Sequence, residues 1–191
     1  KAALMACFME AGIRALLPCG YMGMINQHSW MFLSSYEQLR KELIDSIHID
    51  SLLHLGPRTF PEIGGEVVQN AAFTFCNTGS DKQGIYIRLV DFESSSLKQQ
   101  KALEVIQNSE SNWFYIADKK KYSDLPGHVI GYDFSDKLVE IFQNTTLLKN
   151  LVTTKQGMAT GKDDKFLAIF HEVNLNSIDF YANNLESIQG K

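Results

Sequence analysis

The fold is decided by residues 20–56, which read GYMGMINQHSWMFLSSYEQLRKELIDSIHIDSLLHLG. The run Tyr21–Ile25 is short, apolar and followed by polar residues, as a buried parallel strand is. Residues 36–47 then place apolar side chains at helical spacing. A second apolar run, Ile49–Leu55, ends at a Gly-Pro step. A strand, a helix and a second strand in this order predict a crossover between parallel strands, and with it a doubly wound α/β sheet.

The helix in this run carries its own start signal. Ser34 is followed three residues later by Glu37, which is the spacing of a capping box. This spacing accounts for Ser34 without a catalytic role, because the sequence contains no G-x-S-x-G nucleophile elbow.

Downstream of the crossover, two more strands are expected. After the loop 57–65, the runs Val67–Phe75 and Ile85–Val90 are separated by the turn residues Gly79-Ser80-Asp81. Strands linked by so short a turn are expected to pair antiparallel. The sheet should therefore begin with parallel strands and finish in an antiparallel hairpin at its edge.

Helices flank the sheet region. Residues 3–17 carry an apolar stripe that Pro18 and Gly20 terminate, and 97–106 form a polar-rich helix with serines available as its cap. The first helix has neither a cap residue nor an initiator Met ahead of it, so we expect the chain to be a piece of a longer protein.

A change of composition predicts a domain boundary. Polar and charged residues interrupt the apolar pattern from 108 to 127. We therefore expect a first domain over 1–112, a linker over 113–127 and a second domain over 128–191. The second domain reads as a small α+β segment, with a helix at 134–142 capped by Asp133, an apolar run at 147–152, a turn-rich stretch at 155–166 and a strand-like run at 167–173.

Composition bounds the function. The chain has 191 residues, 45% hydrophobic, 21% charged and with a net charge of −4. It contains no apolar run of membrane-spanning length and no signal peptide, which predicts a cytoplasmic protein. The negative charge argues against a broad nucleic-acid surface, but it leaves room for a local basic cleft.

Metal and redox chemistry are not expected. Cys7, Cys19 and Cys76 are odd in number and each lies in apolar sequence, which favours buried thiols over disulfides or metal ligands. The five histidines form no pair at metal-ligand spacing and none follows an obvious nucleophile. Gly64-Gly65 precedes no helix and no Lys-Ser or Lys-Thr pair, so it reads as a turn and not as a phosphate loop.

Phe60 is the most informative candidate site residue. Pro61 fixes its own φ and holds the preceding Phe60 in extended geometry, so the ring is stiffly placed at the mouth of the sheet. Such a ring suits stacking on a planar ligand, and filling the core is the alternative. Asn26 and His28 end the first strand, where α/β proteins bind ligands, although polar residues also simply end strands.

A second candidate is the basic run Lys119-Lys120-Lys121. Three adjacent lysines usually form a solvated face. They would contact nucleic-acid phosphates only if they lined a cleft.

Four stretches resemble one family: residues 20–30 (GYMGMINQHSW), 36–43 (YEQLRKEL), 53–61 (LHLGPRTFP) and the strand 67–75. They are similar to the post-catalytic half of adenine-specific N6 DNA methyltransferases, of the PglX type of BREX phage defence or of related type IIG and type I restriction-modification methylases. Residues 155–166 (KQGMATGKDDKF) resemble the G-x-x-T-G-x-x-x-x-F stretch that opens the target-recognition region there. The matches cover about 10–75 and 124–173.

The resemblance implies a Rossmann-like sheet that uses S-adenosylmethionine and acts on double-stranded DNA. Because the N6 amino group cannot react within the duplex, the family flips the adenine out. Phe60, with Pro61, matches the aromatic that stacks on this base, and Asn26 and His28 would lie at the rim of the active site. The candidate DNA contacts are Arg58, Lys119, Lys120, Lys121, Lys155, Thr160 and Lys162.

The departures from the family pattern limit what this chain should do. Its four prolines are never adjacent, so the Asn/Asp-Pro-Pro-Tyr/Phe tetrapeptide that grips the adenine amino group is absent from this sequence, and so is an F-x-G-x-G donor loop. We expect the chain by itself to be inactive and to expose sheet surface through which it could associate with itself. The competing interpretation is a non-enzymatic α/β module that binds protein or nucleic acid.

Overall fold

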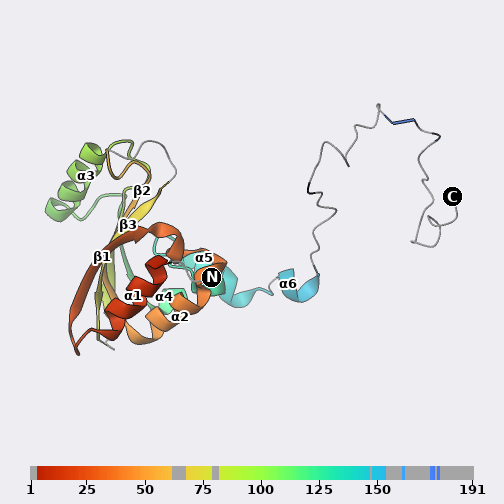
Figure 1. The fold of residues 1–191 in the computed structure, drawn as a ribbon, viewed down its shortest axis with the longest axis horizontal. Coiled ribbons are helices and arrows are strands. Elements are labelled where there is room, and N and C mark those ends of the chain that lie inside the picture. The colour runs from red at the N-terminus through yellow and green to blue at the C-terminus, as the bar shows by residue number, and fades with distance from the viewer. Residues whose placement is uncertain are drawn as a thin grey trace. The chain divides into compact units, whose positions relative to one another are not determined.

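The computed structural model describes residues 4–61, 68–78, 82–146, 148–153, 161, 173–174 and 176. The chain forms two compact units, Lys1–Leu147 and Leu148–Lys191, and the sheet lies in the first (Figure 1). The strands are β1 (Tyr21–Gln27), β2 (His48–Gly56), β3 (Asn70–Cys76), β4 (Gln83–Arg88) and β5 (Phe114–Asp118). The helices are α1 (Leu4–Arg14), α2 (Glu37–Ser46), α3 (Ser95–Gln107), α4 (Lys120–Ser123), α5 (Asp136–Asn144) and α6 (Leu148–Leu151), with short 3-10 helices η1 (His28–Met31), η2 (Ser34–Tyr36) and η3 (Pro126–His128).

The five strands form one mixed sheet in the order β1-β3-β2-β4-β5. β3 lies between β1 and β2 and pairs antiparallel with both of them. β4 pairs parallel with β2, and β5 pairs antiparallel with β4. The mixed α/β fold that the sequence predicts is thereby confirmed.

One predicted pairing, the antiparallel hairpin of β3 with β4, is wrong. β1 and β2 run in the same direction, as expected for a crossover, and β3 lies between them. β3 and β4 run in opposite directions, yet β4 adds to the free side of β2 instead of forming a hairpin with β3. A local turn fixes only the direction of the next strand; its partner is chosen by the apolar faces that must be covered.

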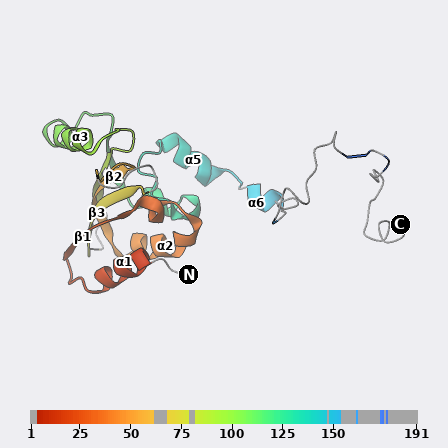
Figure 2. The same cartoon turned by 45° about the horizontal axis from the view of Figure 1, so that its top comes forward.

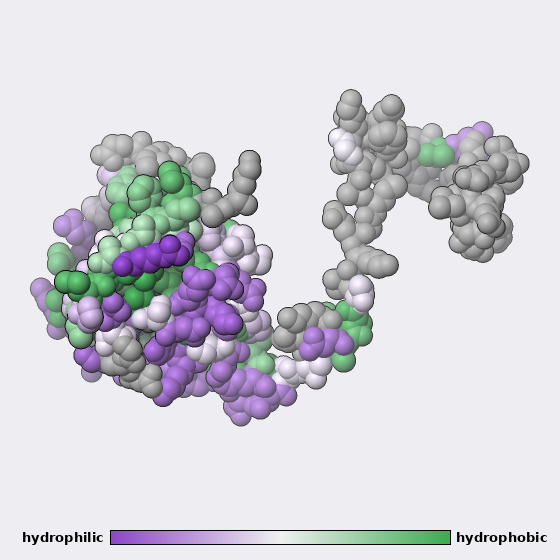
Figure 3. Space-filling view, turned by 60° about the horizontal axis from the view of Figure 1, so that its bottom comes forward, coloured by the Kyte–Doolittle hydropathy of each residue, from purple (hydrophilic) through white to green (hydrophobic). Residues whose placement is uncertain are grey.

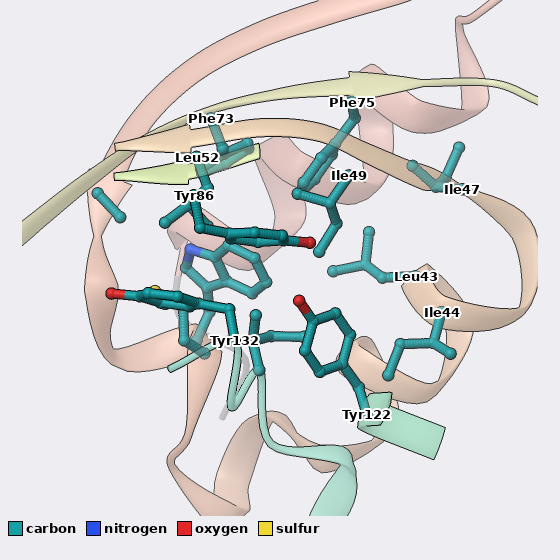
Figure 4. Close-up of a cluster of buried hydrophobic side chains, with 14 of the residues drawn as sticks. Leu43, Ile44, Ile47, Ile49, Leu52, Phe73, Phe75, Tyr86, Tyr122 and Tyr132 are labelled. Atoms are coloured by element: carbon teal, nitrogen blue, oxygen red, sulfur yellow. The ribbon is translucent and has the colours of Figure 1, made fainter. Parts of the chain in front are cut away.

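Helices cover both faces of the sheet, and they do so unequally. α1, α2 and α4 pack on one face, while α3 lies on the other (Figures 1 and 2). The larger core joins apolar side chains of α1 and α2 to the inward residues of β2, β3 and β4 and to two buried tyrosines that follow them, Tyr122 and Tyr132, as Figure 4 shows for part of this cluster. Leu43 of α2, Phe75 of β3 and Tyr86 of β4 are almost fully buried there.

Helix starts differ in part from the expectation. Ser94 caps α3 by accepting a hydrogen bond from the Leu97 N–H at 3.2 Å, as predicted. Ser34 does not cap α2, because η2 runs directly into that helix and the Glu37 N–H bonds to the Ser34 backbone oxygen. At α5 the cap is Ser135, and Asp133 is instead in ion-pair contact with Arg88.

The segment expected to be a linker belongs to the first compact unit. Residues 113–127 contain β5, which extends the sheet, and α4, whose Tyr122 is buried in the main core. Ile130 and Tyr132 also belong to this core, and the unit extends to Leu147. The polar runs that suggest a boundary are a turn before β5 and the start of the short helix α4 after it, and β5 itself has only one buried residue, Ala117.

A buried arginine ties this segment to the crossover. The guanidinium of Arg40, on α2, donates to the backbone oxygen of Gly127 from Nε at 2.9 Å and from a terminal nitrogen at 2.6 Å. It also donates to the oxygens of Trp30 at 2.9 Å and Leu33 at 2.7 Å. Gly127 adopts a left-handed conformation with a φ of 68°. One side chain thus holds η1, η2 and the turn at Gly127 together.

Three further outcomes concern the surface and the ends. Cys76 is buried as expected, but Cys7 and Cys19 are exposed; all three are free thiols. None of the helices in the described part of the chain is long and apolar enough to cross a membrane. Gly64-Gly65, the stretch 155–166 apart from Gly161, and nearly all of the run 167–173 lie outside the described residues.

Candidate functional site

The candidate site lies at the edge of the sheet where β1, β2 and β4 end. These three strands run in the same direction, because β1 and β2 are both antiparallel to β3 and β4 is parallel to β2. Their carboxyl ends therefore bring His28, Gly56 and Arg88 to one edge. This is the edge at which α/β sheets usually bind ligands.

The loop that follows β2 presents Phe60. It begins at Gly56, whose φ of +67° suits glycine, and a Cβ there would lie 2.9 Å from the Val90 Cα. Arg58 is also left-handed, with a φ of 54°. The Thr59 hydroxyl donates back to the Gly56 oxygen at 2.9 Å, which closes a tight turn. The Phe60 side chain emerges 38% exposed, so it does not fill the core.

Lys98, on α3, forms hydrogen bonds with the backbone at the start of this loop. Its side chain, on α3, is only 2% exposed. Its ammonium donates hydrogen bonds to the backbone oxygens of Leu55 and Pro57, the residues on either side of Gly56. Burial is the main cause that lowers the Lys98 pKa, and the nearby Arg58 charge adds to the effect.

Three side chains in hydrogen-bond contact cross the edge, from the start of η1 to the segment after η3. His28 Nδ1 lies 2.7 Å from His54 Nε2, and His54 Nδ1 lies 2.8 Å from the Tyr132 hydroxyl. His54 projects from β2, and Tyr132 is buried in the main core. Neutral histidine carries one ring proton, so His54 donates one of these bonds and accepts the other.

The surroundings of His28, His54 and Tyr132 keep all three side chains uncharged at neutral pH. Burial, followed by the charges of His28 and Arg88, lowers the His54 pKa to about 3. Burial also lowers the His28 pKa and raises the pKa of Tyr132. Arg88 pairs with Asp91 and lies 3.4 Å from an Asp133 carboxylate oxygen.

Asn26 lies on β1, and β3 separates it from His54 of β2. Its side-chain nitrogen contacts the Met24 sulfur at 3.0 Å, and the residue is partly buried. Asn26 thus lies two residues before His28, on the core face of the sheet and near the carboxyl end of β1.

The three lysines at 119–121 lie at the other end of the sheet. β5 ends at Asp118, opposite Gln83 at the start of β4. The Lys121 ammonium donates to the Phe134 backbone oxygen and lies 3.7 Å from an Asp136 carboxylate oxygen. An open pocket of about 460 Å³ here is lined by two of the lysines but by four carboxylates, so the local charge is not basic. These contacts favour a solvated face over a phosphate site.

The structure thus groups some of the predicted residues and separates others. Asn26, His28, Arg58, Phe60 and Pro61 lie at or next to the carboxyl edge. Lys119, Lys120 and Lys121 lie away from it, and Lys155, Thr160 and Lys162 fall outside the described residues.

Four residues of the edge escape prediction from the sequence: His54, Arg88, Lys98 and Tyr132. The position of His54 near the end of a predicted strand, like that of His28, is a signal that could have linked the two histidines. Nothing in the sequence marks Lys98 as buried. Within the described ranges, no group of three or more His, Cys, Asp or Glu side chains could hold a metal ion.

Comparison with known proteins gives the family context. The family model of the Eco57I restriction-modification methylase matches residues 1–60. The adenine-specific methyltransferase PglX of Lacticaseibacillus casei (strain Zhang) is 40% identical over 189 residues, which is 95% of this chain and 15% of the relative. The adenine-specific methyltransferase BrxX of Escherichia coli O9:H4 (strain HS) is 33% identical over 181 residues, or 94% of this chain and 14% of the relative.

A solved structure supports the fold. The modification subunit of a candidate type I restriction enzyme from Vibrio vulnificus YJ016 superposes with a TM-score of 0.52 at 12% identity, over 64% of this chain and 29% of that one. The chain spans only 14% to 15% of the length of its curated relatives. It is thus homologous, over nearly all of its own length, to one segment of the PglX and BrxX adenine-specific methyltransferases.

Proposed function

We propose that the full-length protein is a site-specific DNA adenine N6-methyltransferase of a restriction-modification or phage-defence system, and that this chain forms the target-base side of its active site. The donor would be S-adenosylmethionine. No residue of this chain is assigned to hold it, because the sequence has no glycine-rich F-x-G-x-G loop. The first part of the chain would complete the methyltransferase domain, and residues near its end would begin target recognition.

The observation that carries the proposal is the placement of Phe60. A partly exposed aromatic ring stands on a loop whose start is fixed by a glycine turn and a buried lysine, at the carboxyl edge of the sheet. A ring held in this way can stack on a planar base without losing much conformational freedom on binding. Pro61 stiffens the loop on the far side of Phe60.

The remaining residues at the carboxyl edge suit a base that has been flipped out of the DNA duplex. Flipping an adenine out of the duplex breaks its pairing and stacking, and the protein must replace part of the lost interaction energy. Phe60 would supply stacking, Asn26 and His28 would line the rim, and Arg58 would contact the DNA backbone. The histidine chain is neutral at pH 7, so its role would be hydrogen bonding and not charge neutralisation.

The test is methyl transfer by the purified full-length protein. Labelled methyl groups from S-adenosylmethionine should enter genomic DNA isolated from cells that lack the gene. Phe60→Ala should remove about 1–3 kcal/mol of stacking free energy from the transition state. This loss should lower kcat/KM by roughly 5- to 150-fold. Phe60→Trp should retain most activity, and Phe60→Leu, which keeps apolar bulk without the flat ring, should resemble Phe60→Ala.

Two results would refute the proposal. The first is a folded full-length protein that transfers no methyl group to any adenine-containing duplex. The second, which concerns Phe60 alone, is equal turnover by the wild type and the alanine variant.

A further inference from the structure

Lys98 is an unusual buried residue of this chain. A charged ammonium out of water is costly unless it is paired or fully hydrogen-bonded. Here the ammonium donates to two backbone oxygens, those of Leu55 and Pro57, while its side chain is 2% exposed. A buried charge kept in such a place is expected to hold a particular backbone conformation.

The two carbonyls belong to the turn that aims Phe60. Leu55 is the penultimate residue of β2, and Pro57 is the first residue after the strand. Between them lies Gly56, with its left-handed φ of +67°. Lys98 therefore clamps both sides of the one residue at which the chain leaves the sheet and turns toward Phe60.

Side-chain packing does not fill the space beneath this turn. A largely apolar pocket of about 250 Å³ lies between the sheet and α3. Its lining includes Leu55 of β2, Thr59 of the loop and Lys98 itself. Leu55 also packs in the second core together with Val105 of α3, and the Lys98 hydrogen bonds connect α3 to the backbone of the turn itself.

We propose that Lys98 is a positioning residue, which sets the orientation of the loop 56–61 and, through it, the stacking of Phe60 on the target base. The inference rests on the proposed function for the identity of the stacked group. The clamp itself is a property of α3 and the loop, and it can be tested without catalysis.

The first test is a double-mutant cycle on methyl transfer by the full-length protein. Lys98→Met keeps the length of the side chain and removes its donors, and it should lower kcat/KM by roughly tenfold or more. In a Phe60→Ala background the same change should have less than about a twofold effect, because the stacking that Lys98 supports is already gone. Equal losses in the two backgrounds would overturn the proposal.

A matched control lies one turn away on the same helix. Lys101 pairs with Glu104 at 2.7 Å, and its ammonium lies 5.0 Å from the centre of the Trp113 ring. Among the residues that the structure describes, its ammonium forms no hydrogen bond or ion pair with the loop 56–61. Lys101→Met should leave kcat/KM nearly unchanged in both backgrounds. Thermal unfolding verifies that each variant folds; should Lys98→Met fail to fold, the cycle is run with Lys98→Gln, which retains an amide donor.

The second test needs no activity. Arg58 is exposed in the loop, so trypsin cleavage after Arg58, identified by mass spectrometry, reports how well the loop is held. Lys98→Met should accelerate this cleavage several-fold over the wild type and over Lys101→Met. Unchanged cleavage would overturn the clamp even in an active enzyme. Faster cleavage in a protein without methyl transfer would refute the proposed function and leave the clamp standing.

Discussion

At the scale of residues, one group of hydrogen bonds at the edge of the sheet is partly buried and uncharged. His54 lies between His28 and Tyr132, and its two ring nitrogens are both engaged. Protonating it would turn its acceptor nitrogen into a second donor and would place a positive charge near Arg88. The folded state therefore favours the neutral form of His54.

This arrangement predicts a pH dependence of stability. The His54 pKa falls from 6.5 in the unfolded chain to about 3 in the folded one. The unfolded chain binds the extra proton between these values, so stability is complete above about pH 6.5 and declines as the pH falls toward 3. His54→Gln should remove about 1–2 kcal/mol of the decrease that the wild type shows between about pH 7 and pH 5.

Urea unfolding of the two proteins at each pH measures this difference. Both proteins keep the other histidines, including His28, whose pKa is also lowered, so only the difference between them reports His54. Parallel pH profiles for the wild type and the variant would contradict the prediction.

The sequence predicts some of these residues and not others, for a physical reason. Phe60 and His28 stand next to recognisable breaks, a proline and a strand end, and local chemistry identifies them. Lys98 lies in a polar helix where lysine is ordinarily exposed. Its burial follows from the packing of α3 over the end of β2, which no local pattern contains.

At the scale of elements, the junction between β2 and its loop is closely packed at Gly56. Two features require glycine at position 56: its backbone φ is positive, and Val90 occupies the space that a Cβ would need. A side chain there would strain the backbone and push the loop away from the sheet.

Gly56→Ala should therefore destabilise the chain by about 2–4 kcal/mol, the sum of left-handed strain and overlap with Val90. Gly23→Ala is the matched control, because a Cβ on this strand glycine would meet nothing within 4 Å. Alanine is also the better strand residue, so the control should be neutral or slightly stabilising. Thermal unfolding gives both values; equal destabilisation by the two changes would show that the junction is not special.

The elements themselves follow from periodicity, while their arrangement does not. The alternation and spacing of apolar residues mark each strand from β1 to β4 and the helices α1, α2 and α3 within a few residues. β5 has one buried residue and weak alternation, so its sequence does not predict a strand and resembles a linker. The insertion of β3 between β1 and β2 is a long-range choice, made by covering apolar faces and not by a turn.

At the scale of the whole molecule, the compact unit ends far beyond the polar region that suggested a boundary. Residues 1–147 include β5 and the core side chains Tyr122, Ile130 and Tyr132. Part of the remaining surface is apolar: Tyr21, Ile25, Ile85 and Ile116 are each more than 40% exposed on the sheet. Figure 3 shows hydrophobic surface gathered on one part of the compact unit, beside hydrophilic surface.

Two truncations test where the unit ends. A chain of residues 1–147 should unfold cooperatively at a midpoint close to that of the 191-residue chain. A chain of residues 1–112 loses β5 and the buried tyrosines at 122 and 132, which exposes Tyr86 and the other inward residues of β4. It should show no cooperative transition by circular dichroism. Cooperative unfolding of the shorter chain would return the boundary to 113–127.

The position of β3 between β1 and β2 also bears on how the protein is made. β1 and β2 leave the ribosome first, but neither can hydrogen-bond to the other, since the strand that joins them lies later in the chain. At about 5–20 residues per second, both wait for seconds with unpaired edges. Unpaired edges are templates for pairing with other chains. Both strands are therefore exposed to aggregation until β3 emerges, and chaperone binding to this part of the nascent chain should fall once β3 has paired with them.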